Sequence, residues 1–476
     1  MRSPAMRFPK TVLVPLLAAL ILAGCATGPL PATPAEHALP AVPAVFKEGN
    51  ARFATVAPAE QAERGAWWQA FGDPVLGDLV ERAAARNTSV QEAAARLAQA
   101  RALLRNAEAD RAPQIGIGAG AQRGAGADTA QGSQPASVLT AKANFSYELD
   151  LFGRLAQARD AAGLDADARA ALLQSTRLMV QAETAQTYLT LRALDDERAL
   201  VRQTVAAYDD TLRLTQRRFD AGDVAELDLV RVQGEVAANE AEALALDRRR
   251  AELEHALAVL VGEAASSFQL APQDWRSALP KIPAGVPAAV LARRPDVSAA
   301  QLSLQAAQAR VGVARTAWFP DIALTGAGGF ASTDLGDLFK WSARAWGIGA
   351  LLSLPVFDGG RREANLQNAA AQLDVAAAGY RAQVLGAFRD VEDQLAALRL
   401  LDEQSQAQGR AVTAAARASA LSETRYRNGL VSQIELLDAR RSELRNRRQA
   451  LQVKSAQYQA TVGLVRALGG GWERGA

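Results

Sequence analysis

The strongest constraint on this fold is a repetition of the sequence at a constant offset of 207 positions. Gly222 and Gly429 lie at this offset, and each interrupts a long helical pattern within two similar segments, Arg218–Leu229 and Arg425–Leu436. Further identical pairs at the same offset are Val90 and Val297, Leu97 and Leu304, Ala107 and Ala314, Pro113 and Pro320, Ile115 and Ile322, Leu257 and Leu464, and Gly262 and Gly469. An offset that holds over nearly half of the chain indicates a duplicated unit. We therefore expect two tandem structural repeats, 61–262 and 295–469, with the same order of elements.

Each repeat contains a helical pattern of unusual length. The long helices are expected over 155–219 and 361–427. Each would measure roughly 95–100 Å at 1.5 Å per residue. The lone glycines then predict hairpin tips over 219–229 and 426–436, because glycine adopts the left-handed conformation that ends a helix. The return helices are expected to end near 262 and 468. Their apolar residues recur every seven positions, which predicts coiled-coil packing.

Each repeat also contains two segments with strand-like alternation, near 113–123 and 138–152 and near 320–330 and 344–357. Alternation of apolar and polar residues predicts strands with one apolar and one polar face. In the second segment the polar face consists of Thr140, Lys142, Asn144, Ser146, Glu148 and Asp150. We expect an α+β membrane protein whose four strands contribute to a barrel.

Four strands cannot close a barrel, and an open sheet edge is not tolerated in lipid. A membrane barrel would therefore have to be shared between chains. Two chains would supply eight strands, whose side chains fill the interior of the barrel. Three chains would supply twelve strands, so a trimer is the smallest assembly that leaves a lumen. A soluble sandwich is the alternative, although no second sheet is visible in the sequence.

The N-terminus has the pattern of an export signal. The basic residues Arg2, Arg7 and Lys10 precede an apolar run over 11–23, and small residues lead directly to Cys25, the only cysteine. This arrangement resembles a bacterial lipobox, so we expect residues 1–24 to be a cleaved lipoprotein signal peptide. Covalent lipid on Cys25 would anchor the chain in the membrane. An ordinary signal peptide with a chance cysteine is the alternative.

The segments outside the two repeats are expected to be irregular connections. Residues 25–60 are rich in proline and alanine and are expected to form a lipid-anchored tether. Residues 263–294 contain several prolines and are expected to form an irregular connector, and 470–476 form a C-terminal tail.

Composition disfavours several other functions. The net charge of +2 gives no support for nucleic-acid binding. The two histidines, His37 and His255, offer no catalytic triad or metal cluster, so we expect no enzyme activity, no metal and no cofactor beyond the lipid. The arginine-rich patches over 248–250 and 440–448 are interpreted as solvated helix faces or interhelical pairs.

Four segments resemble signatures of TolC-like outer-membrane efflux proteins, in particular the lipoprotein branch of OprM and NodT-type proteins. They are Trp67–Pro74, Arg293–Val297, Trp318–Pro320 and Leu354–Arg361, and they occur in the family's order. The resemblance covers nearly all of the expected mature chain.

This resemblance implies a homotrimer in the outer membrane of a Gram-negative bacterium. It would have a twelve-stranded barrel, a periplasmic tunnel of twelve helices, and an equatorial belt that includes parts of 45–75, 262–294 and the C-terminal end. The resemblance also implies a passive duct for drugs or other toxic small molecules. An inner-membrane pump of the resistance-nodulation-division type would supply the energy, and a periplasmic adaptor would dock at the tips.

The resemblance assigns residues to this docking. They are Phe219, Gly222, Val224, Leu227 and Leu229 in the first tip, and Tyr426, Gly429, Val431, Ile434 and Leu436 in the second. A purely structural turn is the alternative. Family members often close the periplasmic end with a ring of acidic residues, and Glu423 is the candidate gate residue here. A solvated helix charge is the other interpretation of Glu423.

Two further function classes fit the helical pattern. One is the outer-membrane duct of a type I protein secretion system, and the other is an adhesive or structural coiled coil. The lipobox, the Trp67-Trp68 segment and the Arg293-Arg294-Pro295-Asp296 segment favour the small-molecule efflux branch. The sequence does not specify the exported substrate or the partner pump.

Overall fold

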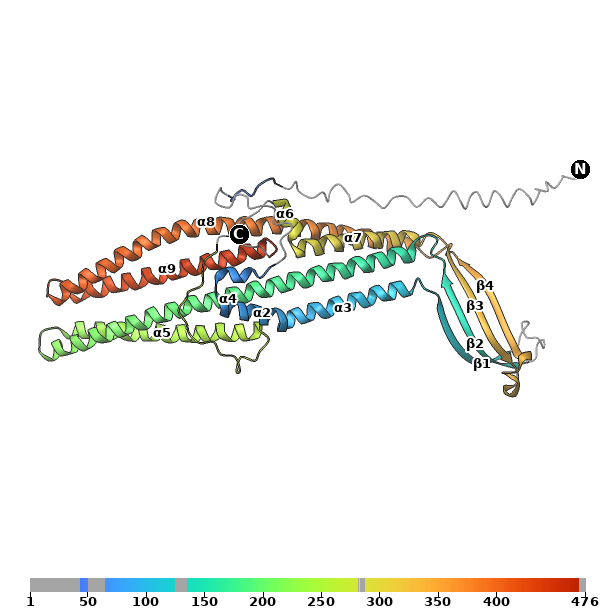
Figure 1. Cartoon of the computed structure of the whole chain (residues 1–476), viewed down its shortest axis with the longest axis horizontal. Coiled ribbons are helices and arrows are strands. Elements are labelled where there is room, and N and C mark those ends of the chain that lie inside the picture. Colours follow the sequence, from blue (N-terminus) through green and yellow to red (C-terminus); the bar gives the residue numbers. More distant parts are fainter. Residues whose placement is uncertain (1–42, 50–64, 125–134, 281, 283–286, 471–476) are drawn as a thin grey trace, which may run out of the picture. The chain divides into compact units, whose positions relative to one another are not determined.

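The computed structural model describes residues 43–49, 65–124, 135–280, 282 and 287–470 (Figure 1). Cys25, the expected signal peptide and the expected tether except residues 43–49 lie outside the described residues. The described chain divides into two compact units. The sheet unit consists of the described residues within Arg101–Asp165 and Ser303–Ala378, and the hairpin unit of those within Leu39–Ala100, Ala166–Leu302 and Gly379–Ala476.

The sheet unit contains one antiparallel four-stranded sheet. Its strands pair in sequence order and are β1 (Gln114–Gly124), β2 (Ala136–Glu148), β3 (Asp321–Ser332) and β4 (Arg344–Ser353). Strands β2 and β3, which come from different halves of the chain, pair with Lys142 opposite Gly329. A Cβ atom at Gly329 would lie 2.1 Å from the Ala141 carbonyl oxygen. Glycine therefore permits the close approach of these two strands.

Strands β2 and β4 end earlier than the sequence pattern predicted. β2 ends at Glu148 rather than near 152, and β4 ends at Ser353 rather than near 357. Asp150 instead caps the next helix, since its carboxylate accepts hydrogen bonds from the N–H groups of Leu155 at 3.0 Å and Ala156 at 2.7 Å. Asp150 matched the polar face of the alternating pattern, although it belongs to the helix start.

Large apolar side chains of the sheet are exposed on the single chain. Ile117 is 92% exposed, and Ile348 is 84% exposed. The soluble sandwich considered from the sequence requires a second sheet over such residues, and the described residues form only one sheet.

In each half of the chain, one helix precedes the first strand. Helix α3 (Thr88–Ala109) precedes β1, and helix α7 (Pro295–Thr316) precedes β3. In the sheet unit, Ala307 and Val311 of α7 pack with Ala369 and Leu373 in a small buried cluster.

Four helices form two hairpins, and their far ends lie in the hairpin unit (Figure 1). The first hairpin consists of α4 (Arg154–Asp220) and α5 (Glu226–Leu260), and the second of α8 (Arg361–Arg427) and α9 (Gln433–Ala467). Helices α4 and α8 each have 67 residues, and α5 and α9 each have 35. The bounds of α3 and α7, of α4 and α8, and of α5 and α9 all differ by 207 positions, as from Arg154 to Arg361.

A compact apolar core lies in the hairpin unit beside the Trp67-Trp68 segment. The short 3-10 helix η2 (Trp67–Phe71) buries both tryptophans and Phe71. Helix α2 (Pro74–Arg86) follows, and the Asp73 carboxylate caps its start. The other carboxylate oxygen of Asp73 accepts hydrogen bonds from Tyr188 and Ser277, both at 2.8 Å. Asp73 thus joins three separate segments of the unit.

The segment between the halves is irregular over 262–280, as expected. Near its end it contains one short helix, α6 (Pro287–Arg293). Proline at the first helical position suits such a start. Among the described helices, none is both long and apolar enough to cross a membrane.

Candidate docking site at the hairpin tips

The first tip is closed by a glycine in the left-handed conformation. Gly222 has a φ of +82°. Its N–H donates to the Phe219 carbonyl at 2.9 Å, and the Asp223 N–H donates to the Arg218 carbonyl at 2.8 Å. These bonds satisfy the free carbonyl groups at the end of α4, and a side chain at Gly222 would strain the backbone.

The second tip repeats this geometry. Gly429 has a φ of +70°. Its N–H donates to the Tyr426 carbonyl at 3.0 Å, and the Leu430 N–H donates to the Arg425 carbonyl at 2.8 Å. The Ser432 side chain caps α9, whereas Ala225, at the same place before α5, has no capping side chain. The hairpin tips expected at Gly222 and Gly429 are therefore present.

The residues expected to dock an adaptor differ in exposure. Leu227 is 58% exposed, and its counterpart Ile434 is 44% exposed. Leu430, which was not in the expected set, is 67% exposed. The half-buried members of the expected set are Phe219, Val224 and Val431, and the buried members are Leu229, Tyr426 and Leu436. Only part of the expected set is therefore available on the single chain for contact with another protein.

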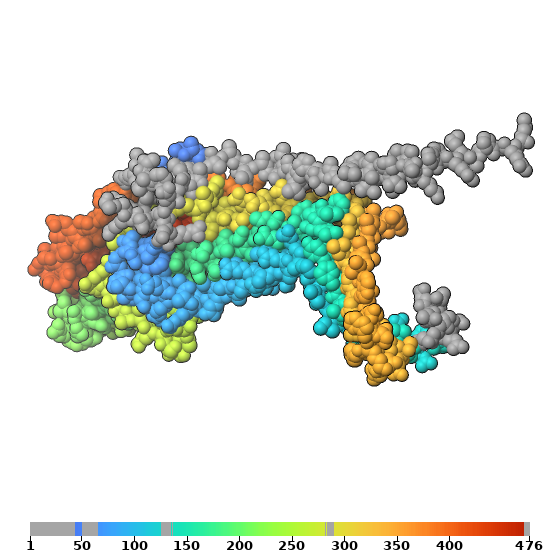
Figure 2. Space-filling view, turned by 45° about the vertical axis from the view of Figure 1, so that its right-hand side comes forward, coloured from blue at the N-terminus to red at the C-terminus, as the bar shows by residue number. Residues whose placement is uncertain are grey.

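The two tips contact each other, and the space-filling view shows them side by side, in green and orange (Figure 2). The guanidinium of Arg218 lies 5.8 Å from the centre of the Tyr426 ring. The Gln433 side-chain amide donates to the Thr215 hydroxyl at 3.0 Å, and both residues are buried. These contacts near the tips therefore join α4 of the first hairpin to the second hairpin.

A cavity of about 510 Å³ lies between the hairpins close to the tips. Arg440 lines it and donates to the Thr211 hydroxyl at 2.6 Å. Glu423 also lines it, pairs with Arg427, and has a carboxylate oxygen 3.6 Å from the Arg440 guanidinium. Burial, followed by the nearby Glu235 carboxylate, raises the pKa of Tyr208, another lining residue, to about 12.

Further from the tips, a row of ion pairs joins α9 to the first hairpin. Arg441 pairs with Glu235. Two helical turns further along α9, Arg448 pairs with Glu197 at 2.7 Å and with Glu242 at 2.6 Å. The seven-residue spacing keeps both arginines on one side of α9. These arginines are interhelical, one of the two interpretations of the patch over 440–448.

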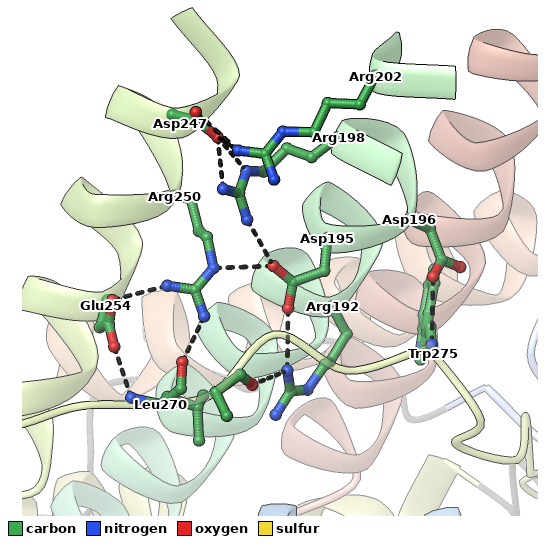
Figure 3. A network of polar contacts seen from close by, with 11 residues as sticks. Arg192, Asp195, Asp196, Arg198, Arg202, Asp247, Arg250, Glu254, Leu270 and Trp275 are labelled. Carbon is green, nitrogen blue, oxygen red and sulfur yellow. Dashed lines mark hydrogen bonds and ion pairs between the residues drawn. The ribbon is translucent and has the colours of Figure 1, made fainter. Parts of the chain in front are cut away.

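A second polar network lies in the hairpin unit (Figure 3). It includes Arg250 of the arginine-rich patch over 248–250, whose pair with Asp195 of α4 is interhelical. Asp195 is 7% exposed and pairs with Arg192 at 2.9 Å and with Arg250 at 2.8 Å. Arg250 also donates to the Leu270 carbonyl, and Arg192 donates to the Ala271 carbonyl at 2.9 Å.

Carboxylates complete this network. The Glu254 carboxylate accepts the Leu270 N–H, and the Asp196 carboxylate accepts the Trp275 N–H at 3.2 Å. Burial raises the pKa of Asp196, and the Trp275 hydrogen bond opposes this shift. The network holds the irregular connector by its backbone. Its segments come from α4, α5 and the connector, and Asp195 and Arg250 are 55 positions apart, so local patterns did not reveal how they meet.

Within the described residues no group of histidine, cysteine or acidic side chains has the arrangement of a metal site. Long helical hairpins and a small antiparallel sheet with exposed apolar side chains fit a membrane channel, because a sheet that spans a membrane must present apolar side chains to lipid.

The comparisons with known proteins assign this channel class to a family. The family model described as outer membrane efflux protein matches residues 79–263 and, a second time, residues 286–470. The chain therefore belongs to the outer membrane efflux protein family, and it is the outer-membrane channel component of a tripartite efflux system.

Two relatives show how far this similarity extends. The chain is 33% identical to outer membrane protein OprJ of Pseudomonas aeruginosa over 99% of this chain and 98% of that protein. It is 29% identical to the cation efflux system protein CusC of Escherichia coli over 97% of this chain and 99% of that protein.

Solved structures agree. The outer-membrane channel OprN matches with a TM-score of 0.84 and 30% identity over 94% of this chain and all of that one. The outer membrane protein VceC of Vibrio cholerae matches with a TM-score of 0.79 and 28% identity over 86% of this chain and all of that one.

Proposed function

We propose that three copies of this chain form one duct that carries small molecules across the outer membrane and the periplasm. The observation that carries this proposal is the single four-stranded sheet, in which β1 and β4 each have one strand neighbour. Free strand edges are costly in lipid, so a closed barrel needs strands from further copies. Three copies would provide twelve strands and a lumen.

The matching halves support the same assembly. The equal helix lengths and the displacement of 207 positions are explained by a tandem duplication, with the two repeats bounded near 61–262 and 295–469. Three copies would then contribute six similar hairpins to a periplasmic tunnel. The segments around η2 and the connector over 263–294 would form an equatorial belt.

The expected lipid anchor fits an outer-membrane location. We propose that Cys25 is acylated after cleavage of residues 1–24, which would attach the tether over 25–60 to the outer membrane. Incorporation of labelled palmitate into the parent chain, and not into Cys25→Ser, tests this assignment. Equal labelling of both proteins would contradict it.

The tips are the proposed site for a periplasmic adaptor, with an inner-membrane pump of the resistance-nodulation-division type as the energy source. Leu227, Leu430 and Ile434 are exposed at the ends of the hairpins and supply apolar contacts. The glycines and the buried residues of the expected set hold the tip in shape. Glu423 is the proposed gate residue, and its ion pairs with Arg427 and Arg440 lie within the second hairpin.

The cargo class is small molecules, and the names of relatives do not narrow it further. Relatives are named for antibiotic efflux and for pyoverdine export in Pseudomonas putida, and for cation efflux in Escherichia coli. Export through such a duct depends on the pump, so one chain type can serve chemically different cargoes.

The decisive experiment is deletion of the gene, followed by a susceptibility profile across antibiotics, solvents and metal ions. We expect increased susceptibility to at least one class, restored by the parent chain. An unchanged profile together with loss of a secreted protein would instead favour the type I secretion duct.

A further inference from the structure

A cavity of about 410 Å³ lies beside the Trp67-Trp68 segment in the hairpin unit. Both tryptophans are buried and line it, together with Leu178 of α4. Their indole N–H groups have no hydrogen-bond partner among the described residues, although a buried indole N–H usually has one. A cavity of roughly 150 Å³ is enough to hold benzene, so this one has room for a larger aromatic side chain.

Two charged side chains also line this cavity. They are Glu81 of α2 and Arg177 of α4, and both residues are exposed. Neither has an ion-pair partner within the part of the chain that the structure describes, whereas Arg82, the neighbour of Glu81, pairs with Glu263 at 2.8 Å. A complementary occupant would therefore bring one charge of each sign.

The last described residues lie at the same cavity. Gly469 and Gly470 follow α9 with φ angles of +87° and +73°, and both line the cavity. A Cβ atom at Gly470 would lie 2.7 Å from a methyl carbon of Leu178, and one at Gly469 would lie 2.9 Å from the Arg293 carbonyl oxygen. The chain therefore leaves α9 through a tight bend that only glycine permits.

The chain continues beyond Gly470 with residues 471–476, which lie outside the described residues. We call them the C-terminal tail, and their sequence is Gly471-Trp472-Glu473-Arg474-Gly475-Ala476. Two extended residues span about 7 Å, so Trp472 is within reach of the cavity that Gly470 lines. The tail contains one large aromatic ring and one charge of each sign, which are the groups that the cavity lining complements.

The first repeat has an equivalent helix end. Gly262, the counterpart of Gly469, follows α5 with a φ of +75°. A Cβ atom at Gly262 would lie 2.6 Å from the carbonyl oxygen of Arg86, and Arg86 is the counterpart of Arg293. The two helix ends therefore pack against equivalent places in their repeats.

The segment after Gly262 shows how the chain is secured beyond such an end. Glu263 pairs with Arg82 of α2 at 2.8 Å, and the Arg82 guanidinium lies 5.7 Å from the centre of the Phe268 ring. Phe268 also packs against the apolar core of the unit. A charged residue and an aromatic ring thus hold the chain after α5, and the C-terminal tail offers the same combination after α9.

We propose that this cavity is the docking site of the chain's own C-terminal tail, with the Trp472 ring beside Trp67 and Trp68. Backbone carbonyl groups of the tail then supply acceptors for the unpartnered indole N–H groups. The docked tail joins the end of α9 to η2 and α2, which lie near the other end of the folded chain.

The charges of the tail match those of the cavity. Glu473 faces Arg177, and Arg474 faces Glu81, so each charge that lacks a partner gains one of opposite sign. This docking goes beyond the proposed duct and holds whether or not the chain exports small molecules.

A disulfide between the tail and the cavity tests the docking directly. Glu81→Cys with Arg474→Cys places a cysteine at each member of one proposed pair. Glu92→Cys with Arg474→Cys is the matched control, because Glu92 is exposed on α3 and is not part of the cavity lining. The full-length proteins, which all retain Cys25, are oxidised in mild detergent, separated on a non-reducing gel and mapped by peptide mass spectrometry.

We expect the cavity variant to form a disulfide within one chain, with a yield severalfold above that of the control. A disulfide that links two chains would overturn the proposal, because the occupant would then be the tail of a second copy. No disulfide in the cavity variant, or equal yields in both variants, would also overturn it. The segment 50–64, which leads to the lining residue Gly65, would then be the remaining candidate from this chain.

Matched truncations measure the same docking without cysteines. A chain that ends after Gly470 lacks the whole tail, whereas a chain that ends after Arg474 keeps Trp472 and both charges. We expect a lower unfolding temperature for the first truncation and for Trp472→Ala, because only these lose the docked ring, and the parent's value for the second truncation. Equal unfolding temperatures in all of these proteins would overturn the proposal.

Discussion

The carboxylate of Asp195 lies 2.8 Å from the Arg250 guanidinium, and both side chains are less than a tenth exposed. Two further arginines, Arg192 and Arg198, pair with the same carboxylate. Asp195 is therefore the shared anion of a buried cationic cluster that also holds the connector by its backbone. Charges in such a place are stable only while they remain paired.

Substitution of Asp195 should be strongly destabilising. Asp195→Ala would leave Arg192 and Arg250 buried without their shared partner, and breaking a buried pair typically costs about 3–5 kcal/mol. We expect a clear fall in the unfolding temperature, measured from the loss of the helical circular dichroism signal on heating. Asp210→Ala, at an exposed position of the same helix (side chain 72% exposed), is the control and should unfold like the parent. Equal unfolding temperatures for Asp195→Ala and the parent would contradict this role.

Two glycines with similar backbone angles should respond differently to alanine. Gly222 has a φ of +82°, and a Cβ there would meet nothing within 4 Å. Gly262 has a φ of +75°, but a Cβ there would lie 2.6 Å from the Arg86 carbonyl oxygen. Gly222→Ala should cost about 1 kcal/mol from backbone strain alone, and Gly262→Ala should cost more because the backbone must also move. Chemical unfolding of both variants measures this order, and the reverse order would refute the steric argument.

The exposed tip residues should matter for export without affecting the fold. Leu227→Glu and Ile434→Glu place a charge where we propose apolar contact with the adaptor, so export should fall severalfold or more. Val259→Glu, on α5 but remote from the tip, is the control, since Val259 is 65% exposed. Drug accumulation in complemented deletion cells gives the readout, and the amount of folded chain in the outer membrane verifies the fold. Normal export in both tip variants would remove these residues from the docking site.

Asp296 should make stability depend on pH in the acid range. Burial acts to raise the pKa of Asp296, but the hydrogen bonds and charge of Arg294 outweigh burial and lower this pKa below its ordinary value. A lowered folded-state pKa means that the stabilisation is present above the unfolded-state pKa of about 3.9 and is lost as the pH falls below it. Unfolding measured from pH 6 down to about pH 3 should therefore show a shallower acid dependence for Asp296→Asn than for the parent. An identical acid dependence would show that Asp296 does not contribute.

Much of this fold could be predicted because its signals are local and repeated. Gly222 and Gly429 mark the hairpin tips through backbone conformation alone, and Asp73-Pro74 marks a helix start through a cap. The ends of β2 and β4 could not be predicted, because a capping residue such as Asp150 has the same polarity as a strand's polar face. Alternation does not distinguish between the two roles.

The ion pairs between the two hairpins could not be predicted from the sequence for a different reason. Arg448 and Glu197 are separated by 251 positions and meet only because α9 packs on α4. A run of arginines on a helix has the same appearance whether it is solvated or paired. Leu227 and Leu229 lie in the same motif, but Leu227 is exposed and Leu229 is buried. This difference arises only from how the hairpin packs.

The mass of the intact assembly tests the central claim most directly. The protein, extracted from the outer membrane in mild detergent, is measured by native mass spectrometry after the detergent is removed. The account predicts a species of three chains, because three four-stranded sheets close one barrel with a lumen. A monomer or a dimer as the stable species would contradict the shared duct, because four strands leave open edges and eight leave no lumen.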